Sequence, residues 1–398
     1  MKKKFITPIV LGMTVSLLMP MYVCADDSGS GSGASSSITT SNTSTSSGAD
    51  ESSTSSSTST TPSNLSLSLE DALNRVEKGY NTIVLDDRYI EILDKQYQED
   101  LANQQSLKET AGSSMVEDDA KTLKLNAPVA LYNLNNEKHQ REIDLKNAKV
   151  SVTSEYENIL AAQMNVDYIS EEISNLQKDM DLINAKIKVG VDKASDIEQD
   201  KATMAQYQAS LNSAKNGIQS SMISLKNDLG IDLNTELTLT SKPMDYVKFD
   251  DTDIEGKIQT AIQNSYSMQA LKQDIENTQI EYSIYKEYSD SQKDDTEVSI
   301  EDKQNQLNQM PNSIEVQLMT QYNALKSLEN TVEADKLSVE AAQISVDTAQ
   351  ANYNSGRITY LELLNAQLQL SQAKNTLQQD IISYMVSVTN VQNSLEEQ

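Results

Sequence analysis

Few side chains in this 398-residue chain could do chemistry, and none has the spacing of a reactive centre. The single histidine, His139, lies in a polar run typical of a solvated helix face. The carboxylates Glu171, Glu172, Asp179 and Asp181 fall between the apolar positions of a heptad pattern, which also predicts a solvated face. The sequence has no glycine-rich phosphate loop, His/Glu metal pair or nucleophile elbow. We therefore expect no catalytic residue, no metal ligand and no cofactor, and hence no enzymatic activity.

The N-terminus predicts export. Three lysines at residues 2–4 precede an apolar run over residues 5–23, and small residues follow at Cys24 and Ala25, so residues 1–25 predict a cleaved signal peptide. Two alternatives remain, a retained membrane anchor and a lipid on Cys24. The polar tract that follows argues against the anchor, and the bulky residues before Cys24 argue against the lipid.

Charge and composition limit the classes of partner that the chain could bind. Cleavage leaves no cysteine, which excludes disulfides and thiolate metal sites in the mature chain. The formal charge of −27 becomes more negative when three lysines are lost, so we expect no nucleic-acid partner. Residues 26–64 are mostly Ser and Thr and predict a disordered linker. A simple tether, a glycosylated stalk and a spacer through cell-wall polymer all remain open for this segment.

The rest of the chain contains an internal repeat. Two stretches match at a constant offset of 166 residues, so that Gly190 aligns with Gly356 and Tyr156 aligns with Tyr322. Each stretch has apolar residues at alternating spacings of three and four, which predicts a long helix with one seam facing a partner. Residues 129–187 as one straight helix would be ~88 Å long.

Each repeat contains a predicted turn. Gly190 and Gly356 sit where a helix must end, because glycine accepts the left-handed conformation that closes a helix. A short turn between two heptad helices makes them adjacent and antiparallel. A capping-box pattern follows each turn, at Ser195–Glu198 and at Thr359–Glu362.

The predicted organisation is two helical repeats, residues 65–230 and 254–398, joined by a connection over residues 231–253 with a short strand near Glu236–Thr240. A shorter helical unit opens each repeat, at an offset of 185 residues. The segments between the shorter and longer helices, residues 109–128 and about 289–301, lack the alternation of membrane-spanning strands.

The segment from Tyr353 to Gln367, a glycine turn followed by Leu363-Leu364-Asn365-Ala366-Gln367, resembles the second hairpin tip of the TolC-type outer-membrane efflux protein family. Weaker similarity lies around Gly190, in residues 68–73 and at Leu229-Gly230. The resemblance implies that three chains with four helices each close a hollow helical tunnel. It also implies a β-barrel in the outer membrane and tips that meet an adaptor.

This sequence departs from the family at the membrane end, because both candidate connections are too polar to supply lipid-facing strands. The expected fold class is therefore all-α. It has two repeated long antiparallel coiled-coil hairpins, as in a TolC-like α-barrel protomer, a short β segment between the repeats and no recognisable transmembrane β-barrel.

The resemblance favours an exported, oligomeric duct component of an efflux or secretion system, with a trimer as the expected oligomer. Its expected partners are a periplasmic or extracytoplasmic membrane-fusion adaptor and an ABC-type or other inner-membrane exporter. Its expected place is the cell envelope, at the outer membrane of a diderm or at the wall or surface of a monoderm. The residues expected to contact the adaptor are Val189, Gly190, Asp192, Gly356, Arg357, Thr359 and Glu362.

Two other interpretations remain open. The first is a structural or adhesive cell-surface coiled-coil rod with no transport role, which the Ser/Thr segment favours. The second is an unrelated two-repeat coiled coil, which requires the motif at Gly356 to be coincidental.

Overall fold

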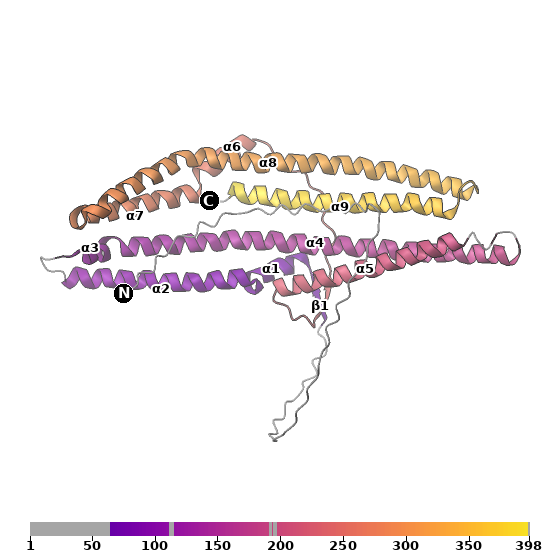
Figure 1. Cartoon of the computed structure of the whole chain (residues 1–398), viewed down its shortest axis with the longest axis horizontal. Coiled ribbons are helices and arrows are strands. Elements are labelled where there is room, and N and C mark those ends of the chain that lie inside the picture. The colour runs from indigo at the N-terminus through magenta and orange to yellow at the C-terminus, as the bar shows by residue number, and fades with distance from the viewer. Residues whose placement is uncertain (1–63, 111–114, 191–192, 194–196, 397–398) are drawn as a thin grey trace, which may run out of the picture. The chain divides into compact units, whose positions relative to one another are not determined.

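The computed structural model describes residues 64–110, 115–190, 193 and 197–396, which belong to one unit spanning residues 60–398 (Figure 1). The predicted signal peptide and almost all of the predicted linker lie outside the described residues. The described elements are two strands, β1 (Asn64–Leu67) and β2 (Glu236–Leu239), and the helices α1 (Leu69–Gly79), α2 (Asn81–Thr110), α3 (Glu117–Lys124), α4 (Asn126–Lys188), α5 (Glu198–Asp228), α6 (Ile254–Gln263), α7 (Tyr266–Tyr288), α8 (Asp290–Asn354) and α9 (Tyr360–Glu396).

The long helices follow the heptad pattern. Helix α4 has 63 residues and α8 has 65, and each folds back through a turn onto a second helix, α5 or α9. Repeat-matched seam positions are buried in both hairpins: Ile159 and Leu325 are at most 1% exposed. The predicted all-α class with two long antiparallel hairpins is confirmed. Within the described ranges, no helix combines the length and apolar character that a membrane crossing needs.

The shorter helices begin where the sequence places them. Ser68 caps α1 by accepting a hydrogen bond from the Asp71 backbone N–H at 3.1 Å. Asp253 caps α6 by accepting one from Gly256 at 3.3 Å, so α1 and α6 start at the predicted 185-residue offset. These short polar side chains satisfy N–H groups that have no partner within the helix.

Both segments between shorter and longer helices are more helical than expected. Residues 109–128 contain α3, whose N-terminus is closed by a hydrogen bond from the Val116 backbone N–H to the Asp119 carboxylate at 3.1 Å. Residues 290–301 already belong to α8, because α7 and α8 are separated only by Ser289. The charged residues that argued against strands there lie on a mostly exposed helix. Asn64, which the sequence analysis placed in the linker, belongs to β1.

The long helices pack in a fixed order. In the half that carries the turns, α5 packs on α4, α4 on α9, and α9 on α8 (Figure 1). In the other half α2 packs on α4 and α7 on α8, with a smaller contact between α4 and α7. Helices α4 and α8 therefore run through both halves. Because α5 and α8 share no comparable contact, the described layer has two open edges.

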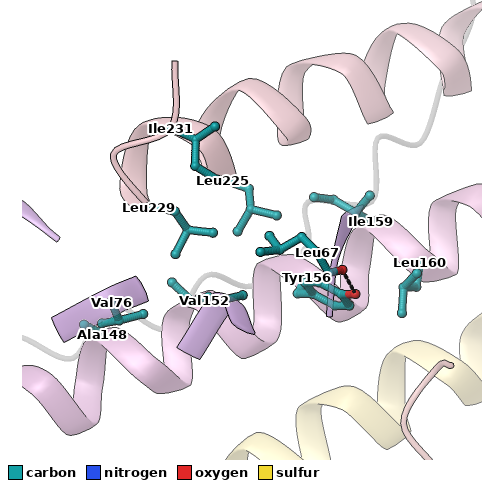
Figure 2. Close-up of a cluster of buried hydrophobic side chains, with 11 residues drawn as sticks. Leu67, Val76, Ala148, Val152, Tyr156, Ile159, Leu160, Leu225, Leu229 and Ile231 are labelled. Carbon is teal, nitrogen blue, oxygen red and sulfur yellow. Dashed lines mark hydrogen bonds between the residues drawn. The ribbon is translucent and has the colours of Figure 1, made fainter. Parts of the chain in front are cut away.

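A small parallel sheet ties the connection between the repeats to the first repeat. Asn64 pairs with Glu236 and Leu67 pairs with Leu239, so β1 joins the start of the first repeat to the connection after it. This strand pair covers the middle of α4, where Leu67, Val152, Tyr156 and Leu225 form a buried cluster (Figure 2).

Tyr156 holds this junction through its hydroxyl. The hydroxyl donates to the carbonyl of Leu67 at 2.8 Å and accepts from the backbone N–H groups of Thr240 and Ser241, both at 3.1 Å (Figure 2 shows the first bond). Further along the connection, the Glu157 carboxylate accepts from the backbone N–H of Met244 at 2.8 Å. The connection is thus fixed to α4 by side chains on two successive residues.

Helices α1 and α5 end against each other. Gly230 has φ +60° and closes α5, while a Cβ added at Gly79 would lie 2.5 Å from the Leu229 carbonyl oxygen. Only glycine fits at position 79, because two backbones approach there without room for a side chain.

Carboxyl pairs cross both hairpins. Glu155 of α4 lies against Asp228 of α5, and its pKa is raised to about 7 by burial and by Asp228. Asp380 of α9 lies against Asp335 of α8, the residue that breaks the heptad pattern, and its pKa is raised to about 6 by burial and by Asp335. Two carboxyls in contact share a proton, because both cannot be ionised side by side at low cost.

Replacing Tyr156 with Phe should destabilise the fold through the repeat junction. The loss leaves the Ser241 N–H without a partner, whereas the Leu67 carbonyl and the Thr240 N–H keep their hydrogen bond to each other at 3.0 Å. Leaving that buried donor unpaired should lower the free energy of unfolding in urea by about 2 kcal/mol. The repeat-matched control is Tyr322→Phe, because Tyr322 donates only to the half-exposed Asp251 carboxylate, at 3.0 Å. We expect this control to lose less than about 1 kcal/mol. Equal losses in the two variants would contradict the assignment.

The carboxyl pairs should make stability depend on pH. The folded protein retains protons that the unfolded chain releases, so this contribution is full below the unfolded pKa and is lost as pH rises through about 6 for Asp380 and about 7 for Glu155. Because other carboxyls respond differently, the informative quantity is the difference between wild type and Glu155→Gln or Asp380→Asn. Between pH 4 and 8 we expect the free energy of unfolding of each variant to fall by about 1–2 kcal/mol less than that of the wild type. Parallel stability curves would exclude the shared proton.

Candidate functional site

The second hairpin tip is a closed, rigid turn. The backbone N–H of Arg357 donates to the Asn352 carbonyl and that of Gly356 donates to the Tyr353 carbonyl, both at 2.9 Å, while Gly356 has φ +70°. This pair of bonds ends α8 in the Schellman arrangement, which needs the left-handed glycine. The turn at Gly356 is therefore as predicted.

The predicted capping box at the start of α9 is present. The Thr359 backbone N–H donates to the Glu362 carboxylate at 2.8 Å, and the Glu362 N–H donates to the Thr359 hydroxyl oxygen at 3.3 Å. These bonds to Thr359 lower the pKa of Glu362 below its usual value. Both side chains are exposed, but the Glu362 carboxylate is committed to shaping the tip.

The first tip is described only in part. Helix α4 ends at Lys188, and Gly190 has φ +80° and donates its N–H to the Ile187 carbonyl at 3.0 Å. Asp192 lies outside the described residues, as does Ser195 of the predicted first capping box. Within the described part, Glu198 opens α5 and pairs with Lys201 at 2.7 Å.

The described docking candidates face solvent. Val189 is 75% exposed, and a Cβ added at Gly190 or Gly356 would meet nothing within 4 Å. Arg357 is exposed and forms no ion pair with any described residue. The described residues of the tips therefore expose apolar and cationic surface to solvent.

The two tips do not end at the same level. The Tyr353 hydroxyl donates to the Asp179 carboxylate at 3.2 Å, and Tyr353 is three residues from Gly356, whereas Asp179 is eleven from Gly190. The first hairpin therefore extends about 12 Å beyond the second, taking 1.5 Å per helical residue. The predicted docking residues form two separate patches.

A second face of α4, distinct from its heptad seam, packs against the second hairpin. Asn165 accepts a hydrogen bond from Asn375 of α9 at 2.9 Å, and Asp179 accepts the bond from Tyr353. Tyr168 and Glu172 lie between these positions at helical spacing. This polar spacing of three, four and seven residues was the available sequence signal for the contact.

The expectation that Glu172 and Asp179 are solvated is wrong. Glu172 is 4% exposed and Asp179 is half-buried, because the contact with α9 and α8 covers this face. Glu171 and Asp181 are exposed, as expected. A heptad analysis assigns one buried seam to a helix and so misses a helix that packs on two sides.

We name Tyr168, Glu172, Tyr207 and Tyr360 the tyrosine–carboxylate cluster; it joins α4, α5 and α9 below the tips. Burial raises the pKa of Glu172 to about 7, and the charge of Glu171 adds to the shift. Burial and the neighbouring Glu172 carboxyl raise the pKa values of the three tyrosines above their ordinary value.

His139 is less exposed than expected. Its ring stacks on Tyr266 of α7 with centroids 3.7 Å apart, and the Tyr266 hydroxyl donates to the Asn136 side-chain oxygen at 2.9 Å. The half-buried imidazole therefore contributes to the contact between α4 and α7. In the part of the chain that the structure describes, no group of three or more His, Cys, Asp or Glu residues could hold a metal ion.

No protein-family model and no curated protein matches this chain. Solved structures do match. CusC, a protein studied for transmembrane channel formation, superposes with a TM-score of 0.63 at 13% identity, over 82% of this chain and 91% of that one. The Campylobacter jejuni CmeC outer membrane channel superposes with a TM-score of 0.62 at 11% identity, over 83% of this chain and 85% of that channel. The Vibrio cholerae outer membrane protein VceC gives 0.57 at 12% identity, over 82% and 94%.

These identities are low, so the similarity concerns the fold. It covers 82–83% of this chain. The chain therefore has the TolC-type fold of these outer-membrane channel proteins.

Proposed function

We propose that this protein is an exported duct component of an efflux or secretion system in the cell envelope. In this proposal three copies close into a helical tunnel. The hairpin tips dock onto a membrane-fusion adaptor, which couples the tunnel to an ABC-type or other inner-membrane exporter. Acidic side chains facing the interior of such a tunnel would favour cationic cargo.

The open-edged helix layer is the observation that carries this proposal. A layer one helix thick cannot bury both edges by itself, and edge-to-edge contact between identical copies closes into a ring. Large apolar side chains are exposed on helices at both edges. On α2 they are Leu85, Tyr89 and Ile92, and on α8 they are Val298, Val316, Leu337 and Ile344.

The fold similarity supports the direction of the proposal. The solved structures with this fold include proteins described as outer membrane channels, from Campylobacter jejuni and Neisseria gonorrhoeae. An envelope location also agrees with the signal peptide that the sequence predicts.

The residues of the tips belong to two groups: some fix the shape of the turn, and others expose a side chain that a partner could contact. Gly190, Gly356, Thr359 and Glu362 fix the turns through backbone conformation and capping. Val189 and Arg357 present an apolar side chain and a guanidinium to the partner. We therefore assign the direct adaptor contacts to Val189 and Arg357, with Asp192 a further candidate.

Arg357→Ala should weaken binding to the proposed membrane-fusion adaptor by about 10- to 100-fold, the range for an interface residue of major importance. Biolayer interferometry with both purified proteins measures the dissociation constant. Lys374→Ala removes an exposed positive charge from α9 away from the tip and should leave the constant unchanged. Equal affinity for wild type and Arg357→Ala would reject docking through this residue.

Val316→Glu should shift the protein from trimer to monomer, because it places a charge on the apolar edge of α8. Sedimentation velocity over a range of concentrations measures the change. Val247→Glu, at a 60% exposed position in the connection between the repeats, is the control and should remain trimeric. A wild-type chain that is monomeric at all concentrations would favour the cell-surface rod instead.

A further inference from the structure

Two buried polar atoms in the tyrosine–carboxylate cluster have no hydrogen-bond partner. They are Oε2 of Glu172 and the hydroxyl oxygen of Tyr168, and both are shielded from solvent. They lie one helical turn apart on the face of α4 that packs against α9. An ionised carboxylate is costly at such a place, because neither water nor a donor compensates its charge.

The groups around Glu172 come from every helix packed against it. Helix α4 contributes Tyr168 and Glu171, α5 contributes Tyr207, and α9 contributes Tyr360. Closer to the tips lie Asp179 of α4, Tyr353 of α8 and Asp200 of α5. Asp200 is 2% exposed. Among the described groups Lys186 acts on Asp179, and no lysine or arginine acts on Glu172.

Glu172 is the member of this cluster whose charge changes near neutral pH. Burial raises its pKa to about 7, whereas the raised pKa values of the three tyrosines keep them neutral over the same range. The neutral carboxyl also has a proton to donate, which fits a site rich in hydroxyl oxygens.

The cluster lies where the start of α9 meets the first hairpin. Tyr360 is the first residue of α9, and Leu364, one turn later, is 1% exposed against Leu176 and Met180 of α4. A change that loosens this contact weakens the attachment of the second tip to the first hairpin, of which the bond from Tyr353 to Asp179 is a further part.

We propose that a proton on Glu172 controls the contact between the two hairpins below their tips: protonated Glu172 holds the start of α9 against α4, and ionised Glu172 releases it. Acid then favours the packed arrangement and alkali the loosened one. If the contact controls the opening of a duct, the inference rests on the proposed function. The dependence of the contact on a proton is a property of the chain itself.

Hydrogen exchange in the full-length protein tests the proposal. Exchange of residues 360–370, corrected for the intrinsic pH dependence of amide chemistry, is compared at pH 6 and pH 8.5. Because one proton is linked to opening, protection of this segment should fall at least about tenfold between the two pH values. Glu172→Gln keeps the shape without the charge and should remove this dependence. Glu171→Gln, at the exposed neighbour, should retain it.

Two results would overturn the proposal: equal corrected protection of wild type at both pH values, or an undiminished pH dependence in Glu172→Gln. If the glutamine variant does not fold, Glu172→Leu supplies the same comparison with an apolar side chain. The measurement needs no adaptor. Failure of adaptor binding or trimerisation would therefore count against the proposed function and leave the exchange result intact.

Discussion

The structure depends on the packing of α4, which is buried on more than one side. Its apolar seam closes the first hairpin against α5, its opposite end lies along α2, and its polar face meets α9. A helix of 63 residues cannot be stable in isolation without such contacts, because most helical stability in proteins comes from tertiary packing. Helices α2, α5, α7 and α9 each cover part of α4, and α8 packs in turn on α7 and α9.

The two repeats use the same scaffold differently. Tyr156 and Tyr322 occupy matched positions, yet Tyr156 is completely buried and bonds three backbone groups, whereas Tyr322 joins a carboxylate that also binds Lys326. The difference arises because the chain between the repeats crosses α4 at Tyr156. Helices α4 and α8 thus have matching sequence patterns, but at the matched position it is the tyrosine of α4 that binds the backbone of the connection between the repeats.

Periodicity was sufficient to predict the long helices, the two glycine turns and the capping box at Thr359, because each depends on residues close together in the sequence. It could not predict the pairing of β1 with β2, whose partners are about 170 residues apart, nor the burial of Glu172. Both depend on which elements meet in three dimensions. The polar signal in the second face of α4 was visible, but a solvated face has the same composition.

The chemistry of the helix contacts also explains why the hairpins need not be fused into one rigid body. Within each hairpin the contact is mainly apolar, and one pair of carboxyls crosses it. Between the hairpins, below the tips, an apolar contact around Leu364 is combined with tyrosines, asparagines and single carboxyls. Apolar stabilisation grows with the area that is buried, whereas a buried carboxyl changes its preference with a single proton. The proposed control by Glu172 would therefore act on the contact between the hairpins, next to the tips, and leave the apolar seam inside each hairpin in place.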